Sequence, residues 1–319
     1  MKIIAQKPIR LDRYLQETLK TPRNQIEQFI KNHGVTIDGK RVFKTGFKLK
    51  ENQTIEFELQ KPKKETPKKV DFDIEIIYED DDLLIINKPP HLIVHPAPSV
   101  KELTLVDWLK HKGISLSTFS GEERHGIVHR IDKETSGALV IAKNNQAHHH
   151  LSKQLEDKSM GRYYLALIDL PLKDHIIVEK AIKRDEKNRT KMAISTDGRE
   201  AKSAFLKLST SKNNTYELIA AKLFTGRTHQ IRVHLKSLSR HILNDFTYGF
   251  KSKKEKNRGR VMLHAYLIYF IHPKSKKLIV KKAPIFEDFK DILQKQFDME
   301  IIDEKTDPNT IISNFSTHF

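Results

Sequence analysis

At residues 129–137 the chain reads HRIDKETSG, and it continues directly into the apolar run ALVIA at 138–142. A short apolar run rich in branched side chains predicts a buried strand. Charged residues placed just before a buried strand are costly, unless each charge finds a partner or the site is functional. A second concentration of this kind, LFTGRTHQIRVHL, occupies residues 223–235. The two segments predict polar loops at strand ends, which form either a salt-bridge network or an active site.

Working outward from these loops, most apolar segments are short and rich in β-branched residues. They predict strands near residues 74–78, 83–86, 137–142, 163–168, 204–208, 216–220 and 231–235. Helical spacing appears at residues 103–111, 145–157 and 287–297. Strands interspersed with a few helices predict an α+β fold, in which a mostly antiparallel mixed sheet is flanked by helices and loops.

The N-terminal residues have a different pattern. Apolar residues at helical spacing predict one helix from Leu11 and a second after Thr21, and an alternating strand at 35–37 leads into an Asp-Gly turn. A helix pair feeding a small sheet makes a compact unit of its own. Residues 61–69, KPKKETPKK, are rich in Pro and Lys without apolar periodicity and predict a linker.

These patterns predict four parts of the chain. The first is a small domain at residues 1–60, and a basic Pro/Lys linker follows at 61–72. A larger domain with the chemistry occupies residues 73–298, and residues 299–319 are predicted to be a polar, frayed tail. Residues 251–260, KSKKEKNRGR, form a basic loop that either contacts RNA or is simply solvated.

The chain is strongly basic, and the charge is uneven. Lys and Arg number 58 against 41 Asp and Glu, and residues 1–70 alone hold 17 against 8. Such a surplus makes a polyanion the natural partner, although solubility alone also explains basic proteins. The chain has no cysteine, which excludes disulfides and Cys-ligated metal. The sequence also lacks an apolar stretch of about 20 residues and a signal-like start, so we expect a cytoplasmic protein without membrane contact.

The N-terminal motif resembles a known RNA-binding module. LDRYL at 11–15 and PRNQIEQFIKNHGVTIDGK at 22–40 are similar to the αL domain that a ribosomal small-subunit protein shares with tyrosyl-tRNA synthetases and several RNA-modifying enzymes. That family usually has Ser or Thr where this chain has Pro22. The resemblance implies RNA contact by the exposed basic residues of this module: Arg13, Arg23, Lys31, Lys40 and Arg41.

The larger domain resembles the RluA/RluD-type pseudouridine synthases. HRIDKETSG matches their HRLDxxTSG signature, and LFTGRTHQIRVHL matches their second signature. INKPPHLIVHP at 86–96 and YYLAL at 163–167 resemble two further segments, in the same order as in the family. Two departures are His91, where the family usually has Gly, and Asn244, where Gly-Asp is usual. A position that favours Gly often needs positive φ, so the shape of these loops is open.

The resemblance implies an isomerase that needs no cofactor. The uracil is cut from its ribose at nitrogen, rotated and rejoined through carbon 5. Asp132 corresponds to the catalytic carboxylate, which either attacks the sugar or removes the 2′ proton. A carboxylate held in a dry pocket needs a cation nearby. The resemblance assigns Arg227 as this ionic partner of Asp132. Tyr164 corresponds to the tyrosine that packs on the uracil, although a core tyrosine would look the same.

Other residues are expected to contact the RNA or to shape the site. Arg130 is predicted to fill the stack that a flipped base leaves, and His129 to shape the loop beside the RNA. We expect no metal, because the histidines lack a recognised ligand spacing. The expected partner is RNA, with large-subunit ribosomal RNA (23S) ahead of transfer RNA, and the expected state is a monomer. The alternative is a non-catalytic RNA-binding or ribosome-assembly protein, which would not need Asp132, Arg227 and Tyr164 together.

Overall fold

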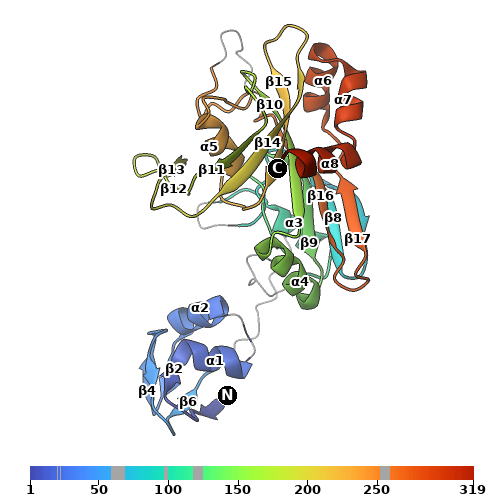
Figure 1. Ribbon diagram of the computed structural model, residues 1–319. Coiled ribbons are helices and arrows are strands. Elements are labelled where there is room, and N and C mark those ends of the chain that lie inside the picture. The colour runs from blue at the N-terminus through green and yellow to red at the C-terminus, as the bar shows by residue number, and fades with distance from the viewer. Residues whose placement is uncertain (20, 22, 59–68, 97–99, 118–124, 252–258) are drawn as a thin grey trace.

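The computed structural model describes residues 1–319 except 20, 22, 59–68, 97–99, 118–124 and 252–258. The chain forms a small N-terminal unit, drawn in blue in Figure 1, and a larger unit built on one extended sheet. The α+β class predicted from the sequence is confirmed. Residues 61–68 of the predicted linker and 252–258 of the predicted basic loop lie outside the described residues.

The N-terminal unit packs two helices on a small antiparallel sheet. The helices are α1 (Leu11–Leu19) and α2 (Arg23–His33). Apolar side chains at helical spacing, among them Leu11, Leu15, Ile26 and Ile30, meet Ile55 of the sheet in one core. The four-stranded sheet has the order β1-β6-β3-β4, and β2 pairs with β5. The strands are β1 (Lys2–Ile4), β2 (Ile9–Arg10), β3 (Val35–Ile37), β4 (Lys40–Val42), β5 (Lys48–Leu49) and β6 (Thr54–Glu56).

The larger unit is organised by a nine-stranded sheet with the order β11-β14-β15-β10-β16-β9-β8-β7, and β17 also pairs with β16. Among the described strands of this sheet, β9 and β16 are parallel and the other pairs are antiparallel. The strands are β7 (Glu75–Glu79), β8 (Leu83–Lys88), β9 (Ser136–Ala142), β10 (Gly161–Ile168), β11 (Ile176–Glu179), β14 (Lys202–Thr210), β15 (Glu217–Leu223), β16 (Leu263–Ile271) and β17 (Leu278–Lys282). A separate hairpin pairs β12 (Ile182–Arg184) with β13 (Met192–Ile194).

Helices cover this sheet and close its core. They are α3 (Leu105–His111), α4 (Asn145–Glu156), α5 (Gln230–Lys236), α6 (Glu287–Gln296), α7 (Met299–Lys305) and α8 (Pro308–His318). Figure 1 shows α6, α7 and α8 together on one flank of the sheet, in orange to red. None of the described helices is both long and apolar enough to cross a bilayer.

Three expectations from the sequence are wrong. Residues 231–235 were expected to form a strand but belong to α5, because a run that is buried on all sides gives no periodicity that separates strand from helix. Residues 299–319 are not a frayed tail, since Ile302, Ile311 and Phe315 are buried in the main core. Val70 lies within the predicted linker but is buried in a core cluster of the larger unit.

The loop that precedes β9 is fixed by its contacts with β16. Ser136 and Gly137 pair with His264 and Ala265 in parallel register. Gly137 has φ +112°, and a Cβ at this position would lie 2.2 Å from the carbonyl oxygen of Ala265. No side chain fits in that space, so glycine is required here. This close contact with β16 therefore fixes the end of the 129–135 loop.

Candidate active site

The two polar segments of the sequence meet at one cavity. It is lined by the loop before β9, by β10, by residues 226–229 and by the first turn of α5. Asp132, Tyr164 and Arg227, the three residues expected to carry the chemistry, all line it, as does Arg130. Residues from sequence positions about 100 apart thus converge on one hollow.

Asp132 lies in a turn whose backbone carbonyl accepts a hydrogen bond from the Thr135 amide at 3.1 Å. Its side chain is 18% exposed, and its Oδ2 lies 3.5 Å from Nη1 of Arg232 and 3.9 Å from Nε2 of His229. Two nitrogen-bearing groups from the α5 region therefore face the carboxylate. This placement agrees with the prediction that Asp132 lies beside a guanidinium in a recessed site.

The guanidinium beside Asp132 is Arg232, and it is held by a second carboxylate. Nε and Nη2 of Arg232 donate to the two oxygens of Asp245 at 2.7 and 2.8 Å, which is a bidentate contact. The guanidinium also lies over the ring of Tyr248, 4.9 Å from its centroid. Burial acts to lower the pKa of Arg232, but the hydrogen bonds and charge of Asp245, with the charge of Asp132, raise it overall. The side chain is thus a fixed cation.

The expected pairing of Asp132 with Arg227 is therefore corrected to Arg232. Arg227 precedes α5, and its Nε donates to the carbonyl oxygen of Glu200 at 2.9 Å. Its backbone amide is bound by the side chain of Gln230, which fixes this loop. Arg227 still lines the cavity. Both arginines lie in the quoted segment 223–235. The contact with Asp245 holds the guanidinium of Arg232 beside Asp132.

Tyr164 points toward the cavity from the middle of β10. Its side chain is 5% exposed, and burial raises its pKa to about 12, so the phenol is neutral at physiological pH. Successive residues of a strand face opposite sides of the sheet. Tyr163 accordingly packs on the other side, against Tyr269 and Phe315. This alternation assigns the cavity side to Tyr164 and the core side to its neighbour.

His129 and Arg130 begin the loop before β9 and have different environments. Nε2 of His129 accepts a hydrogen bond from the Val140 amide at 3.2 Å, which ties the loop to β9. Burial lowers the pKa of His129 to about 3, so its ring is neutral. Arg130 is exposed, and its Nη1 lies 3.3 Å from Nε2 of His95. The geometry agrees with a loop-shaping role for His129.

A buried lysine that the sequence reading did not single out supports the same loop. Nζ of Lys88 donates to the carbonyl oxygens of Pro89, Leu92 and Lys133 at 2.7, 2.9 and 3.2 Å. Burial lowers the pKa of Lys88 to about 7, although the charges of Asp132 and Glu134 act in the opposite direction. Its side chain joins the end of β8 to the residue that follows Asp132.

The two departures from the family pattern keep the loop shape that glycine would give. His91 has φ +64° and Asn244 also has φ +64°. Asn is among the residues that adopt this left-handed conformation most readily. Nδ1 of His91 lies 2.9 Å from Glu134, an ion pair when the ring is protonated. The loop at Asn244 keeps Asp245 in place to bind Arg232.

The basic residues of the N-terminal unit are mostly on its surface. Arg13, Lys31, Lys40 and Arg41 are exposed. Arg23 is half exposed, but its guanidinium binds the buried carboxylate of Asp12, to which Arg10 also binds. Arg23 thus contributes to the fold of the unit as well as to its charge.

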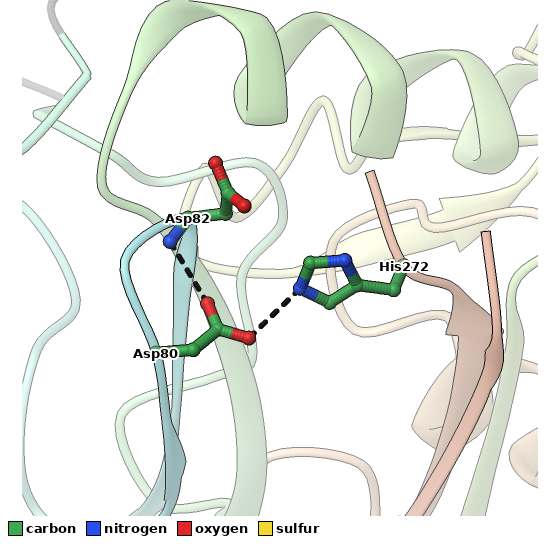
Figure 2. Close-up of side chains that lie close together, drawn as sticks. All are labelled: Asp80, Asp82 and His272. Atoms are coloured by element: carbon green, nitrogen blue, oxygen red, sulfur yellow. Dashed lines mark hydrogen bonds and ion pairs between the residues drawn. The ribbon is translucent and has the colours of Figure 1, made fainter. Parts of the chain in front are cut away.

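Asp80, Asp82 and His272 form a polar cluster away from the cavity, shown in Figure 2. One oxygen of Asp80 accepts from the amides of Asp82 and Leu83, and the other from the Tyr78 hydroxyl and Nε2 of His272. Asp82 in turn accepts from the side-chain amide of Asn144 at 2.8 Å. These bonds join the β7–β8 turn to the end of β16 and to the start of α4. The cluster therefore has a structural explanation.

Buried histidines make the stability of the larger unit sensitive to acid. Burial lowers the pKa of both His148 and His264 to about 4, below the ordinary value of 6.5. Between pH 6.5 and 4 the unfolded chain binds more protons than the folded chain, so stability falls as pH falls through this window. At pH 5 each histidine should cost about 2 kcal/mol of unfolding free energy.

Urea unfolding at pH 7 and pH 5 measures the difference, and the His148→Leu variant should lose less on acidification than the wild type. An equal loss in both proteins would contradict the assignment.

Comparison with known proteins agrees with the geometry. Residues 82–237 match the family described as RNA pseudouridylate synthase, and residues 9–55 match the S4 domain. An uncharacterized RNA pseudouridine synthase of Helicobacter pylori is 49% identical over 315 residues, covering 96% of this chain and 95% of its own. Ribosomal large subunit pseudouridine synthase D of Zymomonas mobilis is 38% identical over 295 residues, covering 88% and 91%. Human RNA Pseudouridylate Synthase Domain Containing 1 has a similar fold, with a TM-score of 0.53, 22% identity and coverage of 70% and 94%.

Proposed function

Because this chain belongs to the RNA pseudouridine synthases, we propose that it isomerises specific uridines of large-subunit ribosomal RNA, with Asp132 as the catalytic carboxylate. The observation that carries the proposal is the position of Asp132 in the cavity, 3.5 Å from a guanidinium and beside a buried tyrosine. RNA as the substrate class follows from the family and from the S4 domain. The choice of ribosomal RNA follows from the Zymomonas mobilis relative, which is a ribosomal large subunit pseudouridine synthase by name.

The geometry suits the demands of the reaction. Breaking the glycosidic bond builds positive character on the anomeric carbon, and an ionised Asp132 either attacks that carbon or removes the 2′ proton. Nη1 of Arg232 faces the carboxylate of Asp132 from a fixed position, because the other two nitrogens of the guanidinium are bound to Asp245. Tyr164 offers a neutral ring on which the uracil packs while it rotates.

Access of the base requires that the uridine leave its stack. Flipping a base out of a helix costs a few kcal/mol. Arg130 is exposed at the rim of the cavity, and its planar guanidinium can fill the space that the base leaves. In this role Arg130 stabilises the RNA in its opened form rather than the transition state of the chemistry.

The proposal is tested by mapping pseudouridines across total RNA from cells with and without the gene. We expect one or a few positions in large-subunit ribosomal RNA to disappear with the gene and to return with the wild-type protein but not with Asp132→Asn. Sites lost from transfer RNA instead would move the target to that class. An unchanged map in both classes would overturn the proposal.

Removing residues 1–60 should weaken RNA binding and flatten its salt dependence. The exposed Arg13, Lys31, Lys40 and Arg41 supply phosphate contacts, and each such contact contributes to the slope of log Kd against log salt. A loss of about four contacts should reduce this slope by about three to four. Filter binding between 50 and 200 mM salt measures it. A truncated protein with the same affinity and slope would exclude the N-terminal unit as a docking element.

We also propose that the protein acts as a monomer in the cytoplasm. Sedimentation of the purified chain, with and without RNA, measures its oligomeric state. A stable dimer would contradict this part of the proposal without affecting the chemistry.

A further inference from the structure

A second cavity adjoins the proposed active site. It has a volume of about 290 Å³, close to the lower end of the range for ligand sites. Arg130, Arg162 and Gly226 line both cavities, so the two share a wall. Arg130 has a part in the proposed mechanism, at the rim, whereas Arg162 has none.

Arg162 is the feature that needs an explanation. It lies on β10 two residues before Tyr164, and it is only 8% exposed. Burial lowers the pKa of Arg162, and among the described residues its Nε is buried without a hydrogen-bond partner. A buried donor that lacks an acceptor costs free energy, and more so when the group is charged. Such a group in a native protein calls for an explanation, and a bound ligand that accepts its hydrogen bond supplies one.

The surroundings of Arg162 specify the charge of that ligand. The described residues that line the second cavity include Arg130 and His129 but none that is acidic. Nδ1 of His129 is a second buried polar atom that lacks a partner within the described part of the chain. Because its Nε2 accepts from the Val140 amide, Nδ1 carries the proton and is a donor. Nε of Arg162 and Nδ1 of His129 are thus two donors that lack acceptors, in a cavity lined by two arginines. Such a cavity is complementary to an anion.

Gly226 keeps the guanidinium open to both cavities. A Cβ at this position would lie 2.8 Å from Nη1 of Arg162. The backbone at Gly226 therefore lies close to the guanidinium, and a side chain at position 226 would displace it. The loop that carries Arg227 and the strand that carries Tyr164 are brought together at this point.

We propose that the second cavity is a phosphodiester subsite, in which Arg162 binds the phosphate group adjoining the target uridine. This inference rests on the proposed function, because RNA supplies the anion. The shared wall lets one nucleotide place its base beside Asp132 and its phosphate beside Arg162. A guanidinium binds phosphate oxygens in a bidentate manner, and contacts of this kind set position rather than sequence. Arg162 is therefore a positioning residue for the flipped nucleotide.

The test uses a synthetic RNA hairpin that carries a uridine found by the mapping experiment. Two further hairpins each carry one neutral methylphosphonate linkage, on the 5′ or on the 3′ side of that uridine. With the wild-type protein, one of the two neutral linkages should raise KM by about tenfold or more, the size of one charged hydrogen bond. The Arg162→Met variant should show that higher KM on the normal hairpin and no further rise with the neutral linkage. A wild-type protein that is indifferent to both linkages would overturn the proposal.

Salt dependence provides an independent readout and its controls. Arg162→Met should reduce the slope of log Kd against log salt by about one, whereas Arg162→Lys should retain the slope. Lys290→Met, an exposed change on α6, should leave it unchanged. If Arg162→Met unfolds, Gly226→Ala displaces the guanidinium and should raise KM in the same way. An unchanged slope in Arg162→Met, or linkage discrimination that persists in it, would remove Arg162 from phosphate binding.

Failure of the subsite and failure of the proposed function give different results. Pseudouridine formed by the wild-type protein on the normal hairpin supports the proposed function, whatever Arg162 does. If no RNA is converted, the salt slope for purified 23S ribosomal RNA, compared between wild type and Arg162→Met, still decides the subsite.

Discussion

Replacing Asp132 with Asn is expected to abolish pseudouridine formation, with a loss in kcat on the order of 10⁴-fold, as for other residues that touch the reacting atoms. The amide has nearly the same shape but no negative charge. It can neither attack the anomeric carbon nor accept the 2′ proton, so both routes that remain open for Asp132 fail together. Nucleoside analysis of digested RNA after single-turnover reactions measures the loss.

The affinity of this variant for RNA separates chemistry from binding. Removing one carboxylate from a basic surface should leave Kd within a few fold of wild type, because phosphate contacts dominate affinity. The melting temperature serves as a control for folding, since Arg232 keeps its two bonds to Asp245. Turnover within tenfold of wild type would exclude Asp132 as the catalytic carboxylate.

The second large effect is expected for Arg232→Lys. One ammonium cannot reproduce three directed contacts, two to Asp245 and one to Asp132. The loss of a preorganised donor beside a reacting group costs about 10²- to 10³-fold in kcat. Because Asp245 would lose its bidentate partner, unfolding free energy should fall as well. Activity is therefore compared below the melting temperature of the variant.

Arg227→Lys is the matched control, since both arginines line the same cavity and the substitution is identical. Its Nε donates to the backbone carbonyl of Glu200 and not to a carboxylate, so we expect less than about a tenfold loss in kcat. A larger loss in Arg227→Lys than in Arg232→Lys would mean that the arginines exchange roles when RNA binds.

How far the sequence predicts this site depends on what a motif can specify. Asp132, Tyr164 and the GRTHQ residues 226–230 line the cavity, and the sequence predicts them because they lie in motifs that resemble those of the family. The partner of Asp132 was predicted wrongly, because Arg227 and Arg232 are five positions apart in one segment. Only the distant carboxylate of Asp245 decides between them. Lys88 lies in the quoted segment 86–96, but that segment gives it no role, and burial of the single cation Arg162 in a strand leaves no mark in the sequence.

In the fold, too, some elements follow from the sequence pattern and others do not. Strands with alternating or branched patterns were predicted correctly, but the run at 231–235 was assigned to a strand although it forms a helix. The C-terminal residues had helix signals that their polarity obscured. Asp307 caps α8 and Pro308 occupies its first turn, while Ile311 and Phe315 lie four residues apart on its buried face.

Phe315 of that last helix has a wider consequence for the enzyme. Its ring packs on Tyr163 with centroids 5.2 Å apart, directly behind the strand that presents Tyr164. A chain that stops short of this residue would expose the core side of β10 to solvent, and Tyr164 on the cavity side would lose the packing behind it. Loss of the final helix is therefore expected to loosen the strand that carries Tyr164.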